Sequence, residues 1–128
     1  MKILVLKDYQ LKVFQSAIEY WHLYLWHHRN PLTRFFHRIG SYFSLFGIVL
    51  SIFGYGILFS FIGISIGYGF AFYGHFTAEK NRPLTFKSPI KAGICNWVLF
   101  IYEIFFDVEA KLKELERLKL NTAEMSSA

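Results

Sequence analysis

The chain has 128 residues, which is enough for one domain, and 54% of them are hydrophobic, 20% aromatic and 18% charged. This composition excludes a typical small soluble core, which has no room for 15 phenylalanines and 8 tyrosines. The net charge of +5 does not indicate nucleic-acid binding, because the basic residues flank apolar runs and form no patch of their own. The single cysteine, Cys95, excludes an internal disulfide and is expected to be a small buried residue.

Residues 9 to 28 are predicted to form an amphipathic helix. Its apolar positions recur at steps of four, three, four and three, which places them on one face: Phe14, Ile18, Trp21, Leu25 and His28. Asn30 breaks this pattern and is suited to cap a new helix, whose first position would be Pro31. We expect that second helix to run through His37 into a membrane.

The sequence carries no Asp, Glu, Lys or Arg for 40 positions between Arg38 and Glu79. One membrane-spanning helix needs roughly 20 apolar residues, so the run predicts a hairpin of two spans at about residues 39–54 and 57–76. Glycines flank Tyr55 and favour the turn there. Close helix contact is expected at the small residues of the two arms: Gly47, Gly54, Gly63, Gly67 and Gly74.

Basic residues flank the hairpin on both sides and predict its orientation. Seven cations stand against one carboxylate, Glu79, in these flanks: Arg29, Arg34, Arg38, Lys80, Arg82, Lys87 and Lys91. By the positive-inside rule, both ends of the hairpin face the cytoplasm. The expected localisation is therefore that of an integral membrane protein.

The C-terminal third contains one more apolar segment, at residues 92–108, which we interpret as a half-buried or third membrane helix. Mixed charges and leucines then indicate a solvated or interfacial helix. We therefore expect a membrane domain at 1–110 and a charged C-terminal helix and tail at 111–128. The predicted fold class is all-α, an integral membrane helical bundle built on a transmembrane hairpin, at about 39–76, with flanking amphipathic helices.

Three of the five histidines are expected to meet. His37 precedes the first arm of the hairpin and His75 ends the second, so antiparallel arms bring them to one depth. His28 lies just upstream, on the apolar face of its own helix. Imidazole suits iron and zinc, so the three residues are candidate metal ligands. The alternative is that each is a polar side chain at a membrane interface, with no metal.

Glu79 lies four residues after His75, so on a helix both side chains share a face and can point at the same centre. It is a candidate ligand, or a residue that orients a histidine from outside the ligand set. The alternative is an ion pair with one of three cations, Lys80, Arg82 or Arg38. Lys80 and Arg82 have two interpretations of their own, which are membrane orientation and capture of an anionic head group.

Two motifs, HHRNPLTRFFH at 27–37 and YGHFTAEKNRPLTF at 73–86, resemble the signature segments of the Mpo-like family. The fungal members of that family are 2-hydroxy fatty acid dioxygenases of phytosphingosine breakdown. The resemblance covers about residues 15–107. It implies a membrane-bound enzyme that depends on Fe(II) and uses dioxygen to shorten a 2-hydroxy fatty acid or related lipid by one carbon.

The resemblance also implies roles for individual residues. The metal ligands would be the three histidines of the motifs: His28, His37 and His75. Glu79 and Arg82 would take part in catalysis, and Lys80 and Arg82 would hold the carboxylate of the substrate. The chain departs from the family in having fewer residues between the two motifs than the fungal enzymes. It also has Ser88 where short relatives often have histidine, and Thr33 where they often have asparagine.

The alternative function is a non-catalytic membrane lipid-binding or scaffold protein of the same fold. In that case the histidines and Glu79 only join the two ends of the hairpin. A small multidrug-type transporter is disfavoured, because the predicted spans contain no charged residue. The sequence does not indicate an oligomeric state.

Overall fold

The computed structural model describes residues 2–127, with side chains described from residue 8 to residue 119. Over this range the protein is all-α, as predicted, and has no strand. The five long helices are α1 (Lys2–Trp26), α2 (Pro31–Leu50), α3 (Leu58–Gly74), α4 (Pro89–Phe105) and α5 (Val108–Ser127). Two π-helical turns, Ser51–Tyr55 and His75–Glu79, extend α2 and α3, and Leu84–Phe86 forms a short 3-10 turn before α4.

The start of α2 agrees with the predicted cap. The side chain of Asn30 accepts a hydrogen bond from the N–H of Leu32 at 2.9 Å, and Pro31 occupies the first helical position. A proline suits this position because its missing N–H would have no partner inside the helix. The helix therefore begins at Pro31 and runs through His37, as predicted, and continues without a break into the first arm of the hairpin.

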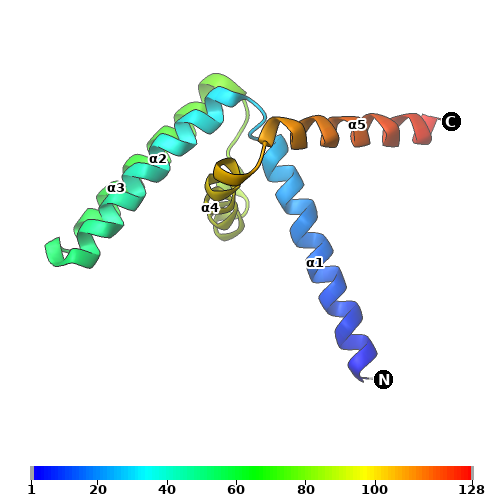
Figure 1. Ribbon diagram of the computed structural model, residues 1–128, viewed down its shortest axis with the longest axis horizontal. Helices are drawn as coiled ribbons and strands as arrows, with labels where there is room; N and C mark the ends of the chain where they lie inside the picture. The colour runs from blue at the N-terminus through cyan, green and yellow to red at the C-terminus, as the bar shows by residue number, and fades with distance from the viewer. Residues whose placement is uncertain (1, 128) are drawn as a thin grey trace.

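Helices α2 and α3 lie side by side as an antiparallel hairpin (Figure 1). The chain reverses at Gly54 (φ 91°) and Gly56 (φ 113°), backbone conformations that favour glycine, so the predicted turn is confirmed. A Cβ at Gly54 would meet nothing within 4 Å. The prediction that Gly54 also belongs to the helix contact is therefore wrong, because this glycine serves the turn.

A seam of small residues joins α2 to α3. A Cβ on Gly47 would lie 2.3 Å from the carbonyl oxygen of Phe59, and one on Gly40 would lie 2.5 Å from that of Gly67. The hydroxyl of Ser44 bonds the Gly40 carbonyl oxygen at 3.0 Å and lies 2.3 Å from where a Cβ of Gly67 would be. The predicted close contact is thus present, and Gly40 is a member that the sequence did not reveal.

The core of the protein lies where α1, α4 and α5 meet at the base of the hairpin (Figure 1). Its buried apolar residues come from these three helices: Tyr24, Leu25, Ala92, Leu99, Val108 and Leu112. The predicted amphipathic face of α1 is buried only at its C-terminal end, since Phe14 is 65% exposed. The first half of α1 and most of α5 project away from the core, and α5 runs continuously across the predicted boundary at residue 110.

Within residues 2–127, one helix, Pro31–Tyr55, is long and apolar enough to cross a membrane by its length and composition. Helices α4 and α5 meet the same criterion only together, and they are bent by 113° relative to each other. The apolar segment predicted at 92–108 is thus α4, which begins at Pro89. Membrane insertion of the hairpin stays a prediction.

Candidate metal centre

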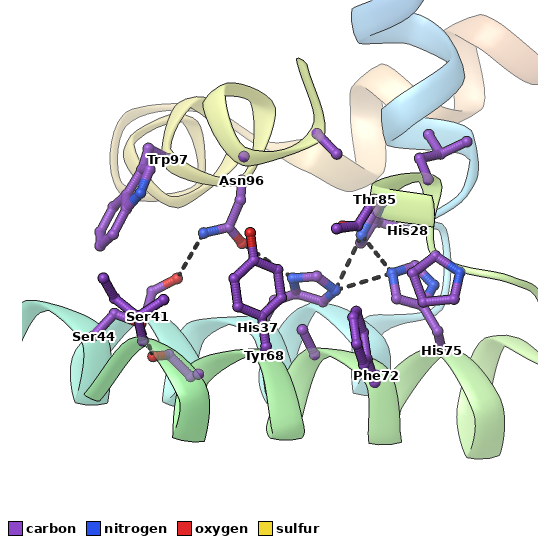
Figure 2. Close-up of a pocket in the computed structure, with 18 of the residues that line it drawn as sticks. His28, His37, Ser41, Ser44, Tyr68, Phe72, His75, Thr85, Asn96 and Trp97 are labelled. Carbon is purple, nitrogen blue, oxygen red and sulfur yellow. Dashed lines mark hydrogen bonds between the residues drawn. The ribbon is translucent and has the colours of Figure 1, made fainter. Parts of the chain in front are cut away.

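Three histidines converge at the base of the hairpin, as Figure 2 shows. His28 lies in the turn after α1, His37 lies in α2, and His75 directly follows α3. The Nε2 atom of His37 is 3.1 Å from that of His28 and 3.1 Å from that of His75, and the remaining pair is 2.9 Å apart. All three rings are buried. The structure therefore brings together the three candidate ligands.

The Nδ1 atom of His28 has a fixed partner, the backbone carbonyl oxygen of Tyr24, at 2.6 Å. A carbonyl oxygen only accepts, so Nδ1 carries the hydrogen and Nε2 carries a lone pair. Burial, followed by the nearby imidazoles of His37 and His75, lowers the pKa of His28 well below its usual value. The ring is therefore neutral at physiological pH, which is the form that binds a metal.

Asparagine side chains hold the other two rings in the same way. Oδ1 of Asn81 accepts from Nδ1 of His75 at 2.7 Å, and Oδ1 of Asn96 accepts from Nδ1 of His37 at 3.1 Å. The Nδ2 atom of Asn81 donates to the carbonyl oxygen of His27 at 3.1 Å, which fixes the orientation of this amide. Such partners on the far nitrogen are a regular feature of metal-binding histidines.

It follows that three Nε2 lone pairs face one another, and none of these nitrogens has a hydrogen to share. This arrangement is repulsive unless a cation lies between them. Imidazole nitrogens bind zinc at about 2.0–2.1 Å, so three of them about 3 Å apart can all bind one ion. The three histidines therefore fit a single transition-metal ion of the kind that imidazole binds, such as iron or zinc.

A cavity of about 250 Å³ opens beside the histidines, between the hairpin and α4 (Figure 2). No Asp, Glu, Lys or Arg lines it among the residues whose side chains are described. Its lining includes the hydroxyl groups of Ser41, Ser44, Tyr68 and Thr85, and toward the hairpin turn it is lined by Ile48 and Ile64. The cavity therefore offers neutral polar groups along its length and aliphatic side chains toward the hairpin turn.

Glu79 lies outside the histidine cluster. Its Oε2 atom accepts from the backbone N–H of Asn30 and the hydroxyl of Thr33, both at 2.8 Å. Its cationic neighbour is Arg29, at 3.9 Å, and not one of the three cations considered from the sequence. Glu79 thus links the turn after His75 to the start of α2. Its predicted catalytic role stays a prediction, and it would act from outside the ligand set.

Lys80 and Arg82 are exposed, and neither lines the cavity. The arrangement around the cavity therefore gives no support to the predicted binding of a substrate carboxylate by these two residues. Ser88 occupies the position before α4 and is not part of the histidine cluster. Thr33, the other departure from the family, instead helps to hold Glu79.

The sequence did not reveal the residues that orient the ligands. Asn96 stands inside an apolar segment, and a polar amide at such a position could have indicated a residue that orients a ligand. Asn81 lies within the second motif, but its side-chain bond to His75 depends on a tight turn. In that turn the backbone N–H of Asn81 donates to the carbonyl oxygen of His75 at 3.1 Å. The sequence does not predict the role of Tyr24, because it acts through its backbone carbonyl group, which every residue has.

Comparison with known proteins adds an independent observation. Residues 14–108 match the family described as 2-hydroxy-palmitic acid dioxygenase Mpo1-like. No curated protein matches the chain, and no solved structure does. The match covers most of the chain and includes all three converging histidines. The protein therefore belongs to the Mpo1-like family.

Proposed function

We propose that the protein is a membrane-embedded, Fe(II)-dependent dioxygenase that shortens a 2-hydroxy fatty acid or related lipid by one carbon. The observation that carries this proposal is the set of three neutral imidazoles whose Nε2 lone pairs converge beside an uncharged cavity. The family description names the same class of reaction. Many non-haem ferrous oxygenases hold iron with two histidines and one carboxylate and keep open positions, and here a third imidazole would take the place of the carboxylate.

The proposed reaction consumes one 2-hydroxy acid and one dioxygen. It gives the acid one carbon shorter, carbon dioxide and water, and the bond between C1 and C2 breaks. Iron(II) bound by the three histidines would supply the electron transfer that dioxygen requires. The asparagines and the Tyr24 carbonyl group keep the imidazoles in the tautomer that leaves Nε2 free.

The cavity supports a substrate with one polar end. No basic side chain lines it among those that the structure describes, so the donors that it offers to a carboxylate or hydroxyl group are neutral, among them the hydroxyls of Ser41, Tyr68 and Thr85. The aliphatic side chains of Ile48 and Ile64, farther along the hairpin, suit an acyl chain. The polar end of the acid would therefore lie at the histidines, with its chain directed toward the hairpin turn.

The proposed membrane location rests on the outer surface of the hairpin. Phe46 is 65% exposed, and Ile52 and Phe53 are each 76% exposed. Contiguous exposed apolar surface of this kind is rare on soluble monomers. The cations at the hairpin base favour a cytoplasmic position for both ends.

Metal analysis of detergent-purified protein, paired with oxygen uptake, tests the proposal. We expect bound iron, oxygen uptake with a 2-hydroxy acid and none with the unsubstituted acid of equal length. His37→Ala should lose both metal and activity, whereas His22→Ala, a histidine outside the cluster, should keep both. Folded wild-type protein that takes up no iron would contradict the proposal. Iron uptake without any oxygen consumption would instead favour a non-catalytic lipid-binding protein.

A further inference from the structure

The backbone of His28 depends on contacts from other elements more than the backbones of His37 and His75 do. His37 lies inside α2, and His75 directly continues α3, so helical hydrogen bonds fix their backbones. His28 follows the last residue of α1, in the turn that leads to Asn30. A ligand in such a turn holds its geometry only if its backbone is held from outside.

Arg34 supplies this support. It lies in the second turn of α2, and its side chain is 6% exposed. Its Nη1 atom donates to the carbonyl oxygen of His28 at 2.8 Å and to that of Arg29 at 3.0 Å. One nitrogen of the guanidinium group thus binds both carbonyl oxygens at the turn that carries the ligand.

The rest of the guanidinium group is held by α4 and α5. Nη2 of Arg34 forms an ion pair with Glu109 of α5, and Nε lies 3.6 Å from Oε1 of Glu103 in α4. The side chain of Glu103 is 9% exposed and also pairs with Arg38. A buried guanidinium needs its charge compensated, and here two carboxylates compensate the charge while two backbone carbonyl oxygens accept from Nη1.

We propose that Arg34 is a positioning residue of the metal centre, which fixes the backbone of the His28 ligand and links the packing of α4 and α5 to metal affinity. The hydrogen bonds of Arg34 go to backbone carbonyl oxygens and to Glu109 and not to the imidazole of a ligand, so it acts through the main chain. The proposal rests on metal binding at the three histidines and is independent of which reaction the metal supports.

Arg34→Lys tests this role with the positive charge retained. The ammonium group of lysine lacks the planar set of donors with which the guanidinium group reaches two carbonyls and two carboxylates together. We expect the dissociation constant for Co²⁺ to rise about 10- to 100-fold, as it does when partners outside the ligand set are lost. The far-UV circular dichroism should not change. Arg38→Lys is the matched control, because Arg38 pairs with the same Glu103 but does not contact the His28 turn, and it should leave Co²⁺ affinity unchanged.

Proton NMR of the Co²⁺-loaded protein separates positioning from general destabilisation. Each bound histidine contributes one strongly shifted, exchangeable Nδ1–H signal. In Arg34→Lys the signal of His28 should broaden or exchange faster, while those of His37 and His75 stay as in the wild type. The signals of His37 and His75 are assigned with Asn96→Ala and Asn81→Ala, which remove their acceptors.

Glu109→Gln is the second variant, and it decides the outcome if Arg34→Lys does not fold. The Glu109 side chain is 53% exposed, so its substitution is compatible with folding, and the same His28 signal should broaden to a smaller extent. Unchanged Co²⁺ affinity and an unchanged His28 signal in the folded variants would overturn the inference alone. Equal changes in all three signals would also overturn it. Wild-type protein that binds no Co²⁺ would overturn both this inference and the proposed function.

Discussion

Asn81 and His75 form a pair in which one amide fixes both a ligand and the turn beside it. Oδ1 of Asn81 accepts from Nδ1 of His75 at 2.7 Å, while its Nδ2 donates to the carbonyl oxygen of His27 at 3.1 Å. The amide therefore joins the end of α3 to the turn that carries His28. The two ligands nearest in space are thus connected through a side chain that binds no metal itself.

Asn81→Leu should weaken metal binding about 10- to 100-fold, because the acceptor that holds the His75 tautomer is lost. Asn81→Asp separates the two bonds, since its carboxylate still accepts from Nδ1 but cannot donate to the carbonyl oxygen of His27, and it should keep more affinity than Asn81→Leu. Competition titration with a chelator of known affinity measures both. Equal affinity of Asn81→Leu and the wild type would show that the tautomer is fixed in another way.

Metal binding should also stabilise the fold. A ligand that binds only the native state adds roughly 2.7 kcal/mol at a free concentration 100 times its dissociation constant. We therefore expect the thermal midpoint of the purified protein to rise on addition of Fe²⁺ under anaerobic conditions and to fall again with a chelator. His37→Ala should show no such shift. A rise of equal size in this variant would place the stabilising ion elsewhere in the protein.

Gly47→Ala should destabilise the hairpin, because its Cβ would lie 2.3 Å from the carbonyl oxygen of Phe59. Overpacking of this kind costs about 1–3 kcal/mol, and here the obstacle is backbone that cannot rotate away. Gly69→Ala is the matched control, since a Cβ there meets nothing within 4 Å. Thermal unfolding in detergent should give a lower midpoint for Gly47→Ala and an unchanged or higher one for Gly69→Ala.

Single-cysteine labelling tests the membrane orientation, and the chain suits it because Cys95 is its sole cysteine. In a Cys95→Ser background, Lys80→Cys should react with a membrane-impermeant maleimide added from the cytoplasmic side of inside-out vesicles. Phe53→Cys, at the turn of the hairpin, should not react from that side. Reaction of both positions from the cytoplasmic side would contradict an inserted hairpin.

The helical hairpin and the convergence of the histidines were predictable because both follow from local rules. An uncharged run of 40 residues with glycines near its middle favours two antiparallel arms, and such arms return His75 to the level of His37. The cap at Asn30 was predictable for the same reason, since it involves only neighbouring residues.

The position of Glu79 was harder to predict, because it depends on contacts between distant parts of the chain. The i, i+4 rule assumes an α-helix, whereas residues 75–79 form a π-helical turn that ends at Lys80 with φ 57°. The carboxylate therefore turns toward Asn30 and Thr33 and away from the ring of His75. The contacts of Arg34 with Glu103 and Glu109 span 69 and 75 residues, and a charge pattern alone does not choose such partners.

The glycine seam between α2 and α3 also sets the alignment of the metal ligands. His37 lies one turn from Gly40, and His75 lies two turns from Gly67, so the contact between these glycines fixes the relative height of the two imidazoles. A slip of one residue would shift one helix by about 1.5 Å, far beyond the roughly 0.2 Å tolerance of metal–ligand distances. The register of the hairpin thus sets the spacing of the metal ligands. Any substitution that changes this register should alter metal selectivity before it unfolds the protein.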